Sequence, residues 1–295
     1  MLTILLGVLE EGLVYAIMAL GVYITYKILD FPDLSVDGTF PLGGAITAVL
    51  IVKGVHPVVT LFISFLVGAL AGLLTGIIHV KLKVRDLLSG IIMMTALYSV
   101  NLRIAGRANV AIFTRDTIFN NAFFDNAIPD AFRPYLIAAI LLVIVIIMKS
   151  LLDLYLRTKS GYLLRAVGDN DALVTSLAED KSTIKIIGLS IANAFVALAG
   201  SIYTQKSGFF EISTGTGTMV IGLASVIIGI NLMKKISFVK ATTAVVIGSV
   251  IYKLCVSVAI QMGMAASDLK MITAGLFLII LVVSNDRKRR AKANA

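Results

Sequence analysis

Charged side chains are scarce in this sequence of 295 residues. Asp, Glu, Lys and Arg make up 15% of it and apolar residues 58%, whereas a soluble globular chain has about 25% and about 45–50%. The mean hydropathy is +0.97, and a folded protein of this size keeps a large surface that could not hide so many apolar side chains. The composition therefore excludes a soluble globular protein and predicts a chain that crosses the membrane several times.

Cysteine and histidine are also scarce. The single cysteine, Cys255, excludes an intramolecular disulfide and a CxxC site. The two histidines, His56 and His79, belong to no cluster with the spacing of metal ligands. The sequence has no P-loop, no HExxH and no G-x-S-x-G motif. We therefore expect no catalytic centre, no metal and no cofactor in this chain.

Long apolar runs fill most of the sequence. A spanning helix needs about 20 mainly apolar residues, so charge-poor runs of this kind predict an all-α, polytopic transmembrane bundle that forms one domain over residues 1–295. Glycines at GxxxG spacing, Gly68, Gly72 and Gly76, predict close helix packing within one span. The nine candidate spans are residues 11–29, 40–55, 58–80, 87–105, 134–154, 186–206, 215–233, 237–260 and 268–285.

Lysine and arginine outnumber aspartate and glutamate by 26 to 17. In a membrane protein, an excess of Lys and Arg is typical of cytoplasmic loops. We therefore attribute the positive charge to such loops and not to nucleic-acid binding. When the basic tail at residues 287–292 is placed in the cytoplasm and the spans alternate, 17 Lys and Arg residues lie inside and 7 outside. This orientation places the C-terminus and residues 156–185 in the cytoplasm, and the N-terminus and residues 106–133 outside.

The two ends of the sequence resemble each other. A shift of 179 residues without a gap aligns eight identical residues within 25 positions, among them Lys27 with Lys206. The same shift carries spans one to four onto spans six to nine, and the charge count gives the two halves opposite orientations. We therefore predict an inverted repeat, an arrangement typical of transporters; the alternative is a coincidence between glycine-rich apolar segments.

Two segments between the spans cannot continue a lipid-facing helix. Residues 29–44 hold two prolines, three glycines and three aspartates, and residues 208–218, which the shift aligns with part of them, are rich in glycine and small hydroxyl residues. Broken helices are tolerated at membrane depth only where the backbone is buried in protein or lines a wet cavity. We expect both segments to line a translocation path, although two ordinary surface connections are the alternative. The predicted path residues are Asp33, Ser35, Asp37, Gly38, Thr39, Thr214, Thr216, Gly217 and Thr218.

Access to water would distinguish these interpretations. Cysteines placed at Ser35, Thr39, Thr214 and Thr216 should react with water-soluble thiol reagents if the loops line a path. The aspartates at positions 30, 33 and 37 could attract a substrate ammonium group or a cation. The favoured interpretation is that they cap helices and stay hydrated.

The cytoplasmic segment contains a candidate amphipathic helix. Asp169 can cap a short helix that carries Leu173, Val174 and Leu177 on one side. Such an apolar face needs a cover, either membrane lipid or a groove on another protein.

Three stretches resemble one family, the bacterial inner-membrane permease subunits of ABC importers of the branched-chain amino acid type, which are related to the ribose-type sugar permeases. They are residues 15–29 (YAIMALGVYITYKIL), residues 160–170 (SGYLLRAVGDN) and residues 219–229 (MVIGLASVIIG). The resemblance implies a dimeric, type II importer-like permease on two ABC ATPase subunits, with an extracytoplasmic solute-binding protein docking outside. It also implies that residues 161–179 form the coupling helix, with Gly161, Arg165, Asp169, Leu173, Val174 and Leu177 as its candidate contacts to the ATPase.

The first loop departs from the branched-chain pattern. Its Asp33-Leu-Ser-Val-Asp-Gly38 run resembles the sugar permeases instead. We expect a small polar solute, an amino acid including aromatic ones, with a sugar-type permease as the alternative. A self-contained secondary transporter would also use inverted repeats and membrane-edge carboxylates, but it gives no reason for a capped apolar helix in a cytoplasmic loop.

Overall fold

The computed structural model describes residues 2–121, 129, 132–169, 180–234, 236, 238–262, 268, 271, 273–275, 277–279 and 281–282. Helices dominate this part of the chain, as the composition predicts. Their order is α1 (Leu2–Val22), the π-helix η1 (Tyr23–Ile28), α2 (Val36–Val52), α3 (Pro57–Val80), α4 (Asp86–Ala105), β1 (Asn109–Ala111), α6 (Arg133–Tyr155), α7 (Lys159–Asp169), α9 (Lys181–Ser207), β2 (Phe209–Glu211), η2 (Ile212–Gly215), α10 (Thr218–Met233) and α11 (Ala241–Gln261).

Seven helical segments within the described residues are long and apolar enough to cross a membrane. They confirm the helical membrane bundle, while the expected total of nine spans stays a prediction. Helix α2, at Val36–Val52, has 17 residues and is shorter than the seven. The last expected span, at residues 268–285, is described only at separate positions.

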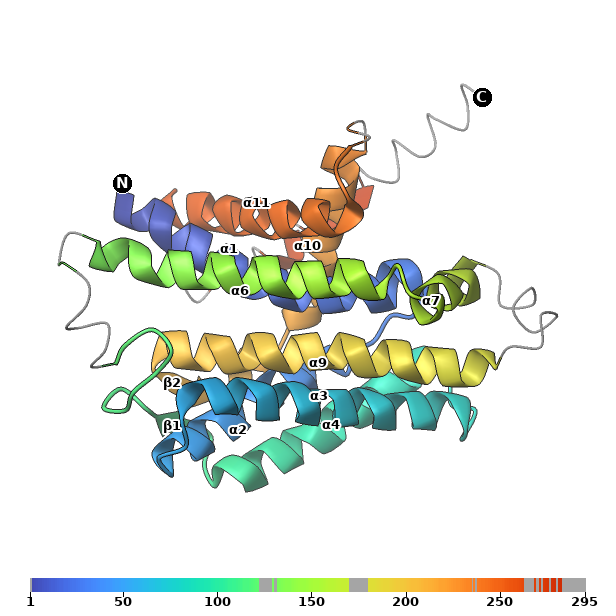
Figure 1. Ribbon diagram of the computed structural model, residues 1–295, viewed down its shortest axis with the longest axis horizontal. Coiled ribbons are helices and arrows are strands. Elements are labelled where there is room, and N and C mark those ends of the chain that lie inside the picture. Colours follow the sequence, from blue (N-terminus) through green and yellow to red (C-terminus); the bar gives the residue numbers. More distant parts are fainter. Residues whose placement is uncertain are drawn as a thin grey trace.

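Helices α1, α3, α6, α9 and α11 run roughly along the long axis of the molecule, whereas α10 crosses it (Figure 1). Helix α7 lies at one end of the molecule and the strand pair β1–β2 at the other. The strands pair antiparallel, with Val110 opposite Phe210, and this small sheet was not predicted. Helices α1 and α9 run in opposite directions, so Lys27 and Lys206 lie at opposite ends of the bundle. This placement agrees with the predicted inverted repeat, which itself stays a prediction.

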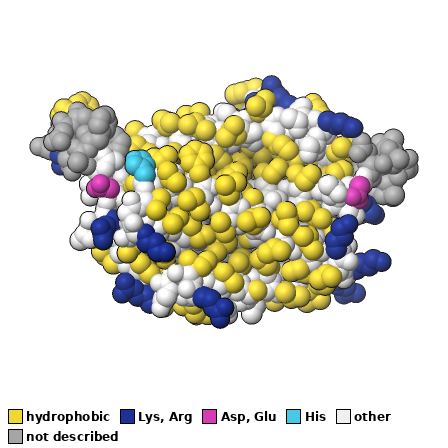
Figure 2. All heavy atoms as spheres, turned by 60° about the horizontal axis from the view of Figure 1, so that its bottom comes forward, with side chains coloured by type: hydrophobic (Ala, Val, Ile, Leu, Met, Phe, Trp, Pro, Cys, Tyr) yellow, Lys and Arg dark blue, Asp and Glu magenta, His cyan; other side chains and the backbone are white. Residues whose placement is uncertain are grey.

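One face of helix α3 packs against the rest of the protein, and the opposite face is apolar and exposed. Its Gly68 and Gly72 lie against the backbone of α9, where a Cβ added at Gly72 would collide with the carbonyl of Leu189. This contact confirms the close packing that the GxxxG spacing predicts. On the opposite face, Phe62 and Leu66 are 68% and 63% exposed. The surface in Figure 2 is broadly apolar across its middle, with Lys and Arg side chains gathered towards both ends, as a bilayer requires.

Helix α1 begins earlier than the sequence suggests, at Leu2 rather than near residue 11. Two glutamates of this helix pair with lysines of other helices; Glu10 is buried and Glu11 is exposed. Glu10 lies 3.3 Å from the ammonium group of Lys206 on α9. Glu11 lies 3.0 Å from that of Lys253 on α11, which also sits 4.0 Å from the centre of the Tyr15 ring. These partners offset the cost of carrying the charges in a membrane helix.

Candidate functional site

The break between η1 and α2 is anchored to the middle of α9 by a buried polar cluster. The backbone N–H of Ser35 donates to Asp33 Oδ1 over 2.9 Å, and Asn193 Nδ2 donates to Asp33 Oδ2 over 2.8 Å. The Ser35 hydroxyl donates in turn to Asn193 Oδ1 over 3.2 Å. All three side chains are fully buried. Asp33 therefore holds the broken segment in place instead of facing a solute.

Asp37 connects the two predicted path segments directly. Its Oδ2 accepts from the N–H of Gly217 over 2.9 Å, and its Oδ1 accepts from the N–H of Met219 over 2.7 Å and from the Thr218 hydroxyl over 2.9 Å. These donors form the first turn of α10, whose N-cap, Gly217, has no side chain to cap the helix. The carboxylate in the first turn of α2 thus caps a helix 180 residues away.

The same contact brings the N-termini of two helices together. Each N-terminus carries a partial positive charge from its unpaired N–H groups, and the Asp37 carboxylate lies at both. A tight approach is required, since a Cβ at Gly215 would collide with the Asp37 carbonyl oxygen and with Pro41. Gly217 has a φ of +86°, a conformation that glycine adopts without strain. The contacts of Asp37 thus agree with the favoured interpretation that the aspartates cap helices. The helix that Asp37 caps, however, is distant in the sequence.

The remaining path residues of the first segment support this junction. Asn101 on α4 donates from Nδ2 to the Gly38 carbonyl over 2.9 Å, and Gly38 lies against Leu97. The Thr39 hydroxyl donates to the Ser35 carbonyl over 3.0 Å. Ser35 and Thr39 have no exposed surface in the chain, so the water access expected for them is not seen. Their hydrogen bonds stabilise the break from inside.

The second segment is nearer the surface. Thr216 is exposed, Thr214 and Gly217 are half-buried, and Thr218 is buried. Asp37 is half-buried as well. The structure therefore brings the two predicted segments together and leaves Asp37, Thr214, Thr216 and Gly217 at least partly exposed.

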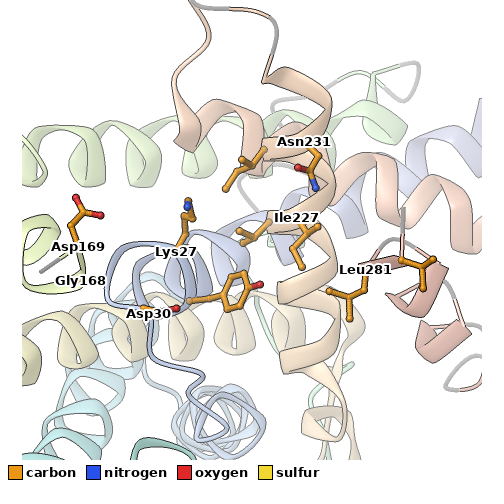
Figure 3. A pocket seen from close by; sticks show the side chains of 11 residues that line it. Lys27, Asp30, Gly168, Asp169, Ile227, Asn231 and Leu281 are labelled. Carbon is orange, nitrogen blue, oxygen red and sulfur yellow. The ribbon is translucent and has the colours of Figure 1, made fainter. Parts of the chain in front are cut away.

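A cavity of about 680 Å³ lies on the α7 side of this junction (Figure 3). Lys27 and Asp30 reach it from η1 and the break, Asp169 comes from the end of α7, and Ile227 and Asn231 come from α10. Figure 3 shows Lys27 between Asp169 on one side and α10 on the other. The remaining lining residues are Tyr26, Gly168, Val226, Ile230, Leu281 and Val282.

Sequence reasoning did not find this cavity. Lys27 pointed only to the internal repeat and to the orientation of its two halves, and Asp30 was considered only together with the two aspartates that follow it. A signal was present, because a lysine and an aspartate three residues apart lie at the start of a helix break. Asp30 also has a φ of +52°, rare for a residue with a side chain, which the sequence does not show.

Helix α7 is packed onto the end of η1. A Cβ at Gly168 would collide with the Ile28 carbonyl oxygen, and a Cβ at Gly161 with that of Tyr155. Leu164 and Val167 are buried, whereas Arg165 is exposed. Of the other predicted coupling residues, Asp169 is the last residue of α7; Leu173, Val174 and Leu177 lie outside the described residues.

The described residues contain no group of three or more His, Cys, Asp or Glu side chains that could hold a metal ion. A capped junction of two helix ends, exposed hydroxyl groups and a cavity with charges of both signs can hold a polar solute weakly.

Comparison with known proteins agrees with this interpretation. Residues 4–282 match the family described as branched-chain amino acid transport system / permease component. The chain is 45% identical, over 99% of its length and 95% of the relative's, to the tyrosine transport system permease protein of Clostridioides difficile (strain R20291). It is 26% identical to the ribose import permease of Escherichia coli (strain K12), over 76% of this chain and 68% of that one.

A probable branched-chain amino acid transport permease of Methanocaldococcus jannaschii is also 26% identical, over 72% of this chain and 70% of that one. No solved structure matches the chain significantly. The match to the family covers almost the whole sequence, including both helix breaks, η1, α7 and α10. The chain therefore belongs to the family of branched-chain amino acid transport system permease components.

Proposed function

We propose that this chain is the membrane-spanning permease of an ATP-driven importer whose solute is an amino acid with an aromatic side chain. The observation that carries the proposal is the junction of α2 and α10 at Asp37, with the charged cavity beside it. The relative named as a tyrosine transport permease, which aligns over 99% of this chain, supports the substrate class.

The cavity supports an amino acid over a sugar. A zwitterion carries an ammonium and a carboxylate group, and the cavity offers Asp30 and Asp169 for the first and Lys27 for the second. Its other wall is apolar, with Ile227 and Ile230 on α10, and suits an aromatic side chain. A sugar would need several neutral hydroxyl partners instead. We place the exit of the path here, with Thr214 and Thr216 on the route from the opposite side.

The partners follow from the same proposal. ATP hydrolysis belongs to separate ABC ATPase subunits, a second permease copy completes the path, and an extracytoplasmic solute-binding protein delivers the solute. Helix α7 and the residues after it up to 179 form the coupling segment on the cytoplasmic side, where the C-terminus also lies. The contact of Gly168 with Ile28 supports this role, since it connects α7 to the segment that leads into the break.

Cysteine accessibility tests the path. In a background without Cys255, which is exposed, a cysteine at Thr216 should react with a small water-soluble thiol reagent, and ATP should change its rate of labelling. A cysteine at Thr39, which is fully buried, is the matched control and should stay unreactive. An unreactive Thr216 position in every state of the reconstituted transporter would place the path elsewhere.

Uptake into vesicles tests the solute. With the permease, its ATPase and its binding protein reconstituted together, labelled tyrosine should be taken up in the presence of ATP, and ribose should not compete. Uptake driven by an ion gradient without ATP would support a secondary transporter instead. Uptake of ribose in place of tyrosine would assign the chain to the sugar permeases.

A further inference from the structure

A second cavity, of about 320 Å³, lies where α6 ends, α7 begins and α11 starts. It is separate from the junction at Asp37 and shares no lining residue with the cavity described above. Its lining residues are Tyr23, Asp153, Leu156, Arg157, Tyr162, Arg165, Lys240, Ala241 and Thr242. Three of them are cationic, and each comes from a different part of the chain.

The positive charges are only partly balanced. Asp153 is the one acid among the lining residues, and its carboxylate is already held by Lys240 Nζ over 2.9 Å, by the Thr242 hydroxyl over 2.6 Å and by Lys149 Nζ over 3.3 Å. Within the part of the chain that the structure describes, neither Arg157 nor Arg165 forms an ion pair. Two guanidinium groups at one cavity, both without an acidic partner, favour an anion with several oxygen atoms.

The position of the cavity identifies the source of that anion. The outer face of α6 is apolar and exposed up to its last turn, where Leu151 is 53% and Leu154 64% exposed. Tyr162, at the rim, is 60% exposed, and tyrosine is typical of the boundary between membrane and water. Phe238, two residues before Lys240, is 87% exposed. The cavity therefore lies where a lipid-facing surface meets the aqueous phase.

We propose that this cavity binds the phosphate headgroup of an anionic phospholipid. Arg157 and Arg165 hold the phosphate, Lys240 adds a third positive charge, and the acyl chains lie along the exposed apolar face of α6. Basic pockets between transmembrane helices are a general means of binding anionic headgroups. Because Arg165 belongs to α7, a bound lipid connects α7 to the end of α6 and makes the position of α7 depend on the membrane.

Thermal unfolding of the full chain in detergent measures this binding. Phosphatidylglycerol should raise the melting temperature of delipidated protein in a saturable way, whereas phosphatidylcholine and millimolar inorganic phosphate should not. Each cation near an anionic lipid contributes about fivefold in affinity. The double variant Arg157→Gln/Arg165→Gln should therefore bind phosphatidylglycerol about thirtyfold more weakly, and it leaves the Lys240–Asp153 pair intact.

The matched control is Lys83→Gln/Arg85→Gln, which removes two exposed cations from a different loop and should leave lipid affinity unchanged. If the double variant does not fold, Arg157→Gln alone should weaken binding about fivefold. The proposal is wrong if the double variant keeps the wild-type affinity or if the control variant loses as much. It is also wrong if inorganic phosphate protects the protein as well as the lipid does.

Discussion

Replacing Asp37 by asparagine should loosen the junction between α2 and α10. The amide has the shape of the carboxylate, but one oxygen becomes an NH₂ group. In the better orientation the amide oxygen keeps the bonds from Met219 and Thr218, while the NH₂ group faces the N–H of Gly217, so that two donors meet. One hydrogen bond is lost and two become weaker without the negative charge.

The magnitude follows from these contacts. Hydrogen bonds to charged groups contribute about 1.5–3 kcal/mol and those between neutral groups about 0.5–1.5 kcal/mol. Asp37 is half-buried, so water replaces part of what is lost. We therefore expect Asp37→Asn to lower the free energy of unfolding by about 1–3 kcal/mol, and to lower uptake as well because α10 loses its cap.

The assay is denaturant or thermal unfolding of the purified permease, paired with uptake by the reconstituted transporter. Asp116→Asn is the matched control, since Asp116 is exposed and should change stability by no more than about 0.5 kcal/mol. A double-mutant cycle with Thr218→Val should show a coupling of at least about 0.5 kcal/mol. Equal stability of Asp37→Asn and Asp116→Asn, with no coupling to Thr218, would refute the role of Asp37 as the cap of α10.

Three further changes test other contacts. Gly168→Ala should push α7 away from the Ile28 carbonyl and reduce uptake at least about tenfold; Gly7→Ala, which meets nothing within 4 Å, should not, and equal uptake by both would contradict the contact. Asn193→Leu should cost about 2–3 kcal/mol of stability by leaving the buried Asp33 carboxylate without its amide donor; a double variant with Asp33→Leu that regains no stability would argue against this cause. The Thr183 hydroxyl lowers the pKa of Asp180, so Asp180→Ala should lower the melting temperature at neutral pH, and the difference should shrink as the pH falls through the pKa of the folded state; a constant difference would exclude the linkage.

The sequence reveals those features of this fold that depend on local chemistry. A run of apolar residues shows a span, and prolines with glycines show a break, because lipid leaves the backbone few alternatives. The aligned positions of the two breaks predict that both line one path, which stays a prediction. The structure does bring them together, at Asp37 and Thr218.

Contacts between distant residues are what the sequence does not reveal. Periodicity gives no sign that Asp37 caps a helix 180 residues later, or that Asp33 is bound by an amide 160 residues away. The start of α1 was misjudged for the same reason, since the partners that make Glu10 and Glu11 tolerable lie on α9 and α11. Each error concerns a charge whose partner lies far along the chain.

These distant polar contacts also explain how the bundle reaches one arrangement. Apolar helices gain little by exchanging lipid for one another, so close packing of small residues and polar contacts between helices must fix their relative positions. Gly68 and Gly72 allow α3 to approach α9, but a glycine stripe alone does not fix register along the helix axis. Asp33 and Asp37 do so, because each carboxylate meets donors at one depth only. The first break is thus tied to α9 through Asp33 and to α10 through Asp37, so a displacement of either helix acts directly on the break.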